Sequence, residues 1–165
     1  MSLFYPCYRF RRIWEIAPEW FTVHQISVVL LDVDNTLTTH DNPEVPDEAR
    51  RWIAQMQKAG IKLLILSNNR PERVEPFARK SGLGCIANAA KPLTRGVRRA
   101  GERLGVQKRE MALIGDQIFT DILCGNLAGI VSILVEPMEL ERFLFFKLKR
   151  AAERVVLRRD RRKEL

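Results

Sequence analysis

The sequence predicts a three-layer α/β fold of the Rossmann-like type, in which helices cover both faces of a parallel sheet of roughly five strands. Short apolar runs alternate with helical patterns along most of the chain, which is the order that a parallel sheet with crossover helices requires. The stretch 27–36 begins as a continuous apolar run rich in Val and Leu, as is typical of a strand buried on both faces. It ends in two carboxylates and a threonine, at the edge where open α/β sheets place their ligands.

Length and composition indicate one globular domain. The chain has 165 residues, of which 46% are hydrophobic and 29% charged, and it is long enough to bury a core. No apolar run approaches the roughly 18 residues that span a bilayer, and the N-terminus lacks the pattern of a secretory signal. We therefore expect a cytoplasmic protein. Its three cysteines, Cys7, Cys85 and Cys124, are too widely spaced for a zinc site or a redox dithiol, and we expect reduced thiols.

The net charge of +8 and the pI near 9.9 predict an acidic partner. Composition alone leaves nucleic acid, anionic lipid headgroups and small phosphorylated substrates open as partners.

Residues 1–24 form an aromatic and basic lead-in. Their aromatic side chains are mixed with arginines and prolines, which is typical of a loop with a short helix around 13–20. Two roles stay open for this lead-in. It covers one edge of the sheet, or it contacts a membrane surface, where Trp and Tyr prefer the interface.

The core predicted for 25–137 repeats one unit of strand, loop and helix. Apolar faces at helical spacing and closing glycines predict helices over 47–59 and 72–80, one that ends near Leu104 and one that ends near Gly129. After the first strand, further strands are predicted at 61–66, 85–87, 111–114 and 130–135.

The pattern of residues 138–165 predicts a basic C-terminal helix. From Leu140 onward, apolar residues recur at spacings of three and four, and many of the other positions are Lys or Arg. The pattern fits an interfacial helix that contacts an anionic membrane. It fits equally a helix that packs its apolar stripe on the sheet and keeps its charges in water.

Three predicted strands end in groups that phosphoryl transfer needs. Asp32 and Asp34 follow the first strand, Ser67 the second and Asp116 the fourth, while Lys91 lies on a loop before a helix. Each would be an ordinary turn residue or solvated charge if it stood alone. Their order and their position at strand ends instead predict one shared site.

Chemistry suggests a role for each of these residues. A carboxylate can attack phosphorus, so Asp32 is the candidate nucleophile that forms an aspartyl phosphate. Asp34 is the candidate acid that protonates the leaving group and the base that later deprotonates water. Ser67 and Lys91 are expected to stabilise the charged phosphoryl oxygens.

The same strand ends predict a Mg²⁺ site. Asp32 and Asp34 would point the same way if their strand continued straight, and two adjacent like charges call for a cation between them. We expect Asp32, the backbone carbonyl of Asp34 and Asp116 to bind Mg²⁺, which prefers oxygen ligands. Asp121 is expected to orient these ligands through hydrogen bonds.

The strand-end residues belong to four short motifs, which are DVDNT at 32–36, SNN at 67–69, KP at 91–92 and GDQIFTD at 115–121. In this order they resemble the four motifs of the haloacid dehalogenase superfamily phosphatases. The resemblance spans nearly the whole core and implies a haloacid dehalogenase-like fold with Mg²⁺-dependent phosphatase chemistry. Within these motifs we also expect Thr36 and Asn68 to bind the substrate.

A narrower resemblance rests on LSNN at 66–69, GDQIFTD at 115–121, GN at 125–126 and the ILV-x-P pattern at 133–137. These segments resemble the YqeG-type phosphatases of subfamily III A, whose relatives include the phosphatidylglycerophosphate phosphatases. By the resemblance, members that cleave carbon–halogen bonds lack an acid at the position of Asp34, and P-type ATPases carry Thr there. Phosphatase or phosphotransferase chemistry is therefore favoured.

Motif spacing predicts that the fold has no cap domain. About 30 residues separate Thr36 from Ser67, and still fewer separate Ser67 from Lys91, which leaves no room for an inserted domain of typical size. An open site suits a large substrate such as a lipid, a protein or a nucleic-acid end.

Three functions follow as hypotheses. The first is hydrolysis of a lipid phosphate such as phosphatidylglycerophosphate, with the basic C-terminal helix in peripheral contact with the anionic inner face of the membrane. The alternative is a phosphatase for nucleic-acid ends or another soluble phosphate ester, although the chain carries no recognised nucleic-acid-binding motif. The third, a non-catalytic basic adaptor, is disfavoured because an adaptor needs no nucleophile such as Asp32 beside an acid such as Asp34. The sequence predicts no oligomeric state.

Overall fold

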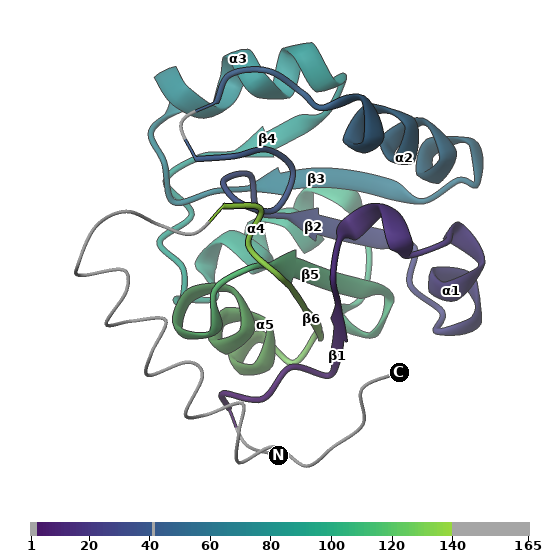
Figure 1. Ribbon diagram of the computed structural model, residues 1–165. Coiled ribbons are helices and arrows are strands. Elements are labelled where there is room, and N and C mark those ends of the chain that lie inside the picture. The colour runs from purple at the N-terminus through teal and green to yellow at the C-terminus, as the bar shows by residue number, and fades with distance from the viewer. Residues whose placement is uncertain (1–2, 41, 140–165) are drawn as a thin grey trace.

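The computed structural model describes residues 3–40 and 42–139 of the chain. Within them, six strands form one parallel sheet in the order β1-β6-β5-β2-β3-β4 (Figure 1). The strands are β1 (Tyr8–Phe10), β2 (Val28–Leu31), β3 (Lys62–Leu66), β4 (Gly84–Ile86), β5 (Met111–Gly115) and β6 (Val131–Val135). The predicted α/β fold is confirmed, with one strand more than expected.

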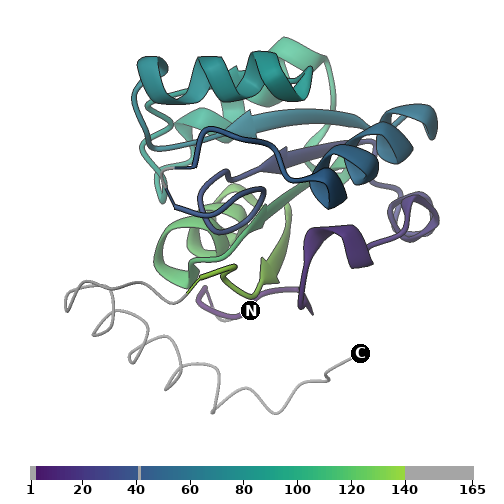
Figure 2. The same cartoon turned by 45° about the horizontal axis from the view of Figure 1, so that its top comes forward.

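Helices cover the two faces of this sheet. They are α1 (Pro18–Val23), α2 (Asp47–Lys58), α3 (Pro71–Ser81), α4 (Arg95–Leu104) and α5 (Leu123–Ala128), and a π-helical turn at Ile118–Ile122 precedes α5. Figure 2 shows α2 and α3 together on one side of the sheet, while α4 and α5 contribute to a separate core on the other side.

Strand β2 lies in the middle of both hydrophobic cores. Its four residues are 0% exposed. Val29 and Leu31 belong to the core that includes residues of α2 and α3, whereas Val28 and Leu30 belong to the core that includes residues of α4 and α5. Alternate side chains of a strand point to opposite faces, so a strand that is apolar at every position is needed here.

The lead-in adds the sixth strand, which the sequence did not predict. Strand β1 pairs with β6, with Tyr8 opposite Ile133. Two further contacts hold the lead-in. The indole of Trp52 donates a hydrogen bond to the carbonyl of Ile16 over 2.9 Å. Trp20 packs edge-on against Tyr8, with 4.8 Å between the ring centroids. The expected loop thus contains a three-residue strand, and the lead-in covers one edge of the sheet.

After β6 the chain crosses to the loop that follows β2. The amide of Glu136 donates to Arg11 O over 3.3 Å, and the amide of Met138 donates to Asn35 O over 3.2 Å. Glu139 N also donates to Asn35 Oδ1 over 3.2 Å. From residue 140 onward the predicted basic helix over 138–165 lies outside the described residues.

The segments between the strands are short. Between β2 and β3 the described residues form a loop and α2, and β4 begins soon after α3. No cap domain is therefore inserted at either point, as predicted. None of the helices in the described ranges has the length and apolar character needed to cross a membrane.

Candidate active site

The candidate site lies at the carboxyl edge of the sheet. Asp32 follows β2, Ser67 follows β3 and Asp116 follows β5. Strand β2 pairs directly with β3 and β5, and all three run parallel, so their ends bring these three side chains to one edge. Lys91 reaches the same place from the loop between β4 and α4.

Lys91 is the buried cation of the site, with a side chain that is 2% exposed. Its Nζ donates to Asp32 Oδ1 over 2.7 Å and to Asp121 Oδ1 over 2.6 Å. Burial by itself lowers the pKa of Lys91, but the Asp121 and Asp32 carboxylates together outweigh it and hold the pKa above its usual range. Lys91 is therefore protonated at neutral pH.

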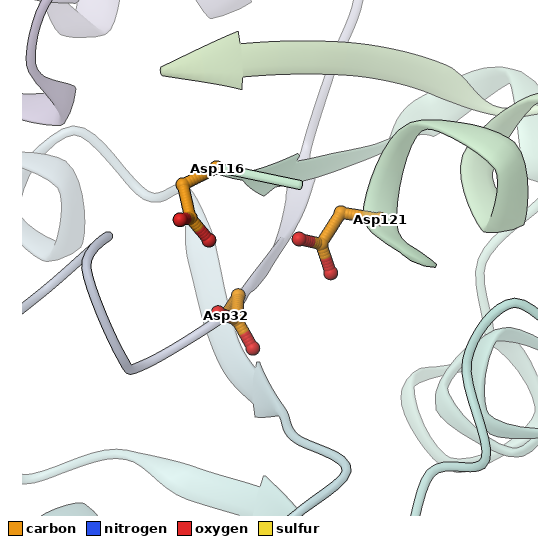
Figure 3. Close-up of side chains that lie close together, drawn as sticks. All are labelled: Asp32, Asp116 and Asp121. Carbon is orange, nitrogen blue, oxygen red and sulfur yellow. The ribbon is translucent and has the colours of Figure 1, made fainter. Parts of the chain in front are cut away.

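Three carboxylates converge beside this lysine. Asp32, Asp116 and Asp121 each offer an oxygen that lies within 4.8 Å of the others (Figure 3). Asp116 and Asp121 are both 1% exposed. Burial is the main reason that the pKa of Asp32 is raised to about 6, while the charge of Lys91 opposes the rise.

This donor set fits a divalent cation. Three acidic groups face one lysine, so the cluster has an excess of negative charge when all three are ionised. Hard divalent cations such as Mg²⁺ take carboxylate and carbonyl oxygens as ligands, and one such ion would balance the excess charge. The fit rests on the chemistry of the three carboxylates and on their mutual distances.

The Asp121 side chain can join the cluster because residue 115 is a glycine. A Cβ atom added at Gly115 would lie only 2.3 Å from Asp121 Cγ. The other Asp121 oxygen, Oδ2, accepts a hydrogen bond from Gln117 N over 3.1 Å. The π-helical turn that contains Asp121 folds its side chain back over the end of β5, and only glycine leaves room for it.

Asp34 points toward the start of α3, and its carboxylate is not part of the three-carboxylate cluster. Asn69 Nδ2 donates to its Oδ2 over 2.5 Å, and Arg73 Nη2 donates to its Oδ1 over 2.8 Å. The expected alignment with Asp32 required a straight strand. Strand β2 instead ends at Leu31, and the chain turns around Val33, whose carbonyl accepts three backbone N–H bonds.

Ser67 and Thr36 are buried at the same edge, at 2% and 1% exposure. Ser67 Oγ accepts a hydrogen bond from Asn69 N over 3.2 Å. Thr36 Oγ1 is buried without a hydrogen-bond partner among the described residues, so its hydroxyl can serve a ligand. That either residue contacts substrate stays a prediction.

Asn68 is bonded to the Lys91 backbone through both ends of its side-chain amide. Its Nδ2 donates to Lys91 O over 2.9 Å, and its Oδ1 accepts from Lys91 N over 2.7 Å. The predicted contact of Asn68 with substrate is untested. In the structure its amide positions the loop that carries the buried lysine.

Sequence reasoning did not single out Asn69, Arg73 or Gly115. Asn69 and Gly115 lie inside the quoted motifs, but the motifs do not indicate which atoms these two residues contact. Arg73 lies in the first turn of α3, six residues after Ser67. A helix that starts at the ligand edge of the sheet was the available signal, because its first turn must lie near that edge.

Known proteins resemble this chain in sequence and in fold. Residues 21–129 match the haloacid dehalogenase-like hydrolase family. YqeG of Bacillus subtilis (strain 168), described as a probable phosphatase, is 33% identical over 153 residues, which cover 93% of this chain and 89% of that protein. Phosphatidylglycerophosphate phosphatase 1, chloroplastic/mitochondrial, of Arabidopsis thaliana is 25% identical over 146 residues, which cover 83% of this chain but only 39% of the plant protein.

Among solved structures, an uncharacterized protein from Listeria monocytogenes serotype 4b shares the fold. Its TM-score is 0.59 at 21% identity, and the match covers 72% of this chain and 85% of that one.

Proposed function

Since this chain belongs to the haloacid dehalogenase-like hydrolase family and is a phosphatase of the YqeG type, we propose that it hydrolyses phosphomonoesters with the help of Mg²⁺. We propose further that the reaction passes through an aspartyl phosphate on Asp32. The observation that carries this proposal is the contact of the protonated Lys91 with Asp32, next to Asp116 and Asp121. The charge of Lys91 opposes the rise in the pKa of Asp32 that burial causes, and a buried cation at this place attracts a phosphate ester.

In the first step, Asp32 attacks phosphorus while the ester oxygen leaves. Lys91 bonds Asp32 Oδ1, so we assign the attack to Oδ2. The P–O bond to the alcohol breaks, and Asp34 gives the leaving oxygen a proton. The phosphoryl group is then bonded to Asp32.

In the second step, Asp34 takes a proton from water, and the water oxygen attacks the phosphorus. The bond between phosphorus and Asp32 breaks, which releases inorganic phosphate and restores the carboxylate. Lys91 stabilises negative charge on the phosphoryl oxygens throughout, and we assign hydroxyl contacts to Ser67 and Thr36. Dividing one hydrolysis into two displacements lets Asp34 serve as acid and then as base.

Asp32, Asp116 and the backbone carbonyl of Asp34 would hold Mg²⁺. Asp121 accepts a hydrogen bond from Lys91, which also bonds Asp32, so Asp121 would orient Asp32 through that lysine. Bound there, the ion supplies positive charge that offsets the charge of the phosphoryl oxygens.

For the substrate we propose a lipid phosphate such as phosphatidylglycerophosphate. Sequence supports this in two ways. The named plant relative is a phosphatidylglycerophosphate phosphatase, and positive charge is concentrated in residues 140–165, which hold ten of the 28 Lys and Arg but only four of the 20 Asp and Glu. That segment accounts for +6 of the net +8.

The last described residues before the basic segment lie close to the site. The backbone amides of Met138 and Glu139 donate hydrogen bonds to Asn35, which directly follows Asp34. Each Lys or Arg near an anionic bilayer contributes about 1 kcal/mol of attraction. A basic segment that follows Glu139 in the sequence would bring the site to phosphates at a membrane surface, and we propose this peripheral contact as the mode of substrate access.

Phosphate release from three substrates tests the assignment. They are phosphatidylglycerophosphate in anionic vesicles, a 5′-phosphorylated DNA end and butyl phosphate, each with Mg²⁺. We expect the lipid to be preferred in kcat/KM by about tenfold or more, because membrane contact raises its local concentration. Replacing the five Lys and Arg of 158–163 by Gln should remove this preference without changing turnover of butyl phosphate. Turnover of the DNA end or of butyl phosphate with none on the lipid would discard the lipid assignment and keep the phosphatase.

A further inference from the structure

The beginning of α3 holds the Asp34 carboxylate through both of its oxygens. Asn69 bonds Oδ2 over 2.5 Å and Arg73 bonds Oδ1 over 2.8 Å. The side chains of Asp34 and Arg73 are 13% and 24% exposed, so bulk water screens this pair only in part. The proposed reaction gives neither Asn69 nor Arg73 a role.

Arg73 also reaches the loop that follows β2. Its Nη2 lies 3.3 Å from Asn42 O, so one guanidinium joins Asp34 to that loop. Further along the same helix, Lys80 holds the loop independently of Asp34, through Glu44 Oε1 at 2.5 Å and Pro43 O at 3.5 Å.

Helix α3 does not need Arg73 in order to stay on the sheet. Val74, Phe77 and Ala78 face the core from this helix and are at most 3% exposed. Burial of such apolar side chains outweighs one partly exposed ion pair. The main effect of the Arg73 contact is therefore on the position of the Asp34 carboxylate.

The position of Asp34 matters because it must meet two different oxygens. A general acid and base works only within hydrogen-bond reach of the proton that it moves, and a displacement of about 1 Å at a catalytic group can cost about 100-fold in rate. A carboxylate tied at both oxygens cannot turn freely about its side-chain bonds.

We propose that Arg73, assisted by Asn69, is a positioning residue that holds the Asp34 carboxylate in place for proton transfer to the leaving group. The inference rests on the proposed role of Asp34 as acid and base. Arg73 exchanges no proton itself. It keeps its charge while Asp34 gives a proton to the ester oxygen and later takes one from water.

Two soluble esters that differ in their leaving group make the test selective. The alkoxide of butyl phosphate needs a proton as it leaves, whereas 4-nitrophenolate leaves without one. Because kcat/KM reports the free enzyme and substrate up to the first transition state, a misplaced Asp34 lowers kcat/KM for butyl phosphate and spares that for 4-nitrophenyl phosphate.

We expect Arg73→Met to lower kcat/KM for butyl phosphate by about tenfold or more and that for 4-nitrophenyl phosphate by no more than about twofold, since general acid catalysis contributes about 100-fold or more. Asn69→Ala should show the same selectivity. Lys80→Met is the matched control, as it releases the loop but not Asp34, and should leave both constants unchanged. Equal losses on the two esters, no loss with Arg73→Met, or a selective loss with Lys80→Met would overturn the inference.

A double-mutant cycle separates this inference from the proposed function. In an Asp34→Asn background, Arg73→Met should have no further effect on butyl phosphate, and an undiminished effect would overturn the inference alone. If Asp34→Asn itself caused no selective loss, or if the wild type hydrolysed neither ester, the proposed function would fall first. A crystal structure of Arg73→Met gives a result without kinetics: Asp34 is expected to leave its position, and an unmoved Asp34 contradicts the inference.

Discussion

Lys91 Nζ lies 2.7 Å from Asp32 Oδ1, at the centre of the carboxyl edge of the sheet. The same ammonium group lies 2.6 Å from Asp121 Oδ1. One buried cation thus serves two carboxylates, one of which is the proposed nucleophile. We therefore expect Lys91 to contribute to stability as well as to the proposed reaction.

Replacing Lys91 by Met leaves the carboxylates without their cation. We expect the metal-free variant to lose about 3–5 kcal/mol of unfolding free energy, because breaking a buried ion pair leaves an uncompensated charge. Mg²⁺ should restore part of this stability, since it binds the folded state and balances the same oxygens. Urea denaturation with and without Mg²⁺ measures both effects.

Lys80→Met is the control for this experiment. Lys80 pairs with Glu44 through side chains that are 45% and 66% exposed, and such surface pairs contribute no more than about 1 kcal/mol. Similar losses in the two variants would contradict the account of Lys91.

Gly115→Ala should disturb the three-carboxylate cluster. The added Cβ would lie 2.3 Å from Asp121 Cγ and 2.5 Å from Asp121 Cβ, so the backbone has to shift. We expect a loss of about 1–3 kcal/mol of unfolding free energy and weaker Mg²⁺ binding, measured by thermal unfolding over a range of Mg²⁺ concentrations.

Gly101→Ala is the matched glycine substitution. Gly101 lies in α4, and an added Cβ there would meet Met111 Sδ at an ordinary 3.5 Å. This variant should gain about 0.5–1 kcal/mol, since alanine is the better helix former. Unchanged Mg²⁺ binding by both variants would refute the role assigned to Gly115.

The raised pKa of Asp32 predicts how Mg²⁺ binding depends on pH. Burial raises this pKa to about 6, so the metal-free folded protein binds the proton more tightly than the unfolded chain does. The ionised Asp32 therefore reduces stability as pH rises from the unfolded pKa toward 6, and the full reduction is present above that pH.

Mg²⁺ must displace this proton at low pH. We expect its affinity to fall about tenfold for each pH unit below about 6 and to level off above it, because one proton is released on binding. Calorimetric titration at several pH values measures the slope. An Asp32→Asn variant should bind Mg²⁺ more weakly and lack this inflection, and an inflection that survives in it would assign the proton to another group.

The sheet could be predicted from the sequence because its central strands are apolar at every position. Strand β2 lies between two cores and carries no polar residue, and such a short apolar run has few alternatives to a central strand. Strand β1 escaped prediction because it has three residues, one of them Arg9, and lies at the sheet edge. Its place depends on pairing with β6, more than 120 residues away in the sequence, and local patterns do not carry that information.

The site could be predicted as a set of residues but not as a set of contacts. Spacing along the chain indicated that Asp32, Lys91 and Asp116 meet at one edge, since parallel strands end together. The direction of Asp34 was not predictable, because it depends on the turn around Val33 that follows the end of β2. Its bond to Arg73 joins residues 39 positions apart, and no short motif specifies such a pair.

Trapping the phosphorylated enzyme tests the central claim most directly. The wild type would be mixed with 4-nitrophenyl phosphate and Mg²⁺, quenched in acid, and analysed by peptide mass spectrometry beside Asp32→Asn. The account predicts one added phosphoryl group on Asp32 in the wild type, and neither this group nor turnover in Asp32→Asn. A phosphoryl group on another residue, or turnover at the wild-type rate by Asp32→Asn, would contradict it.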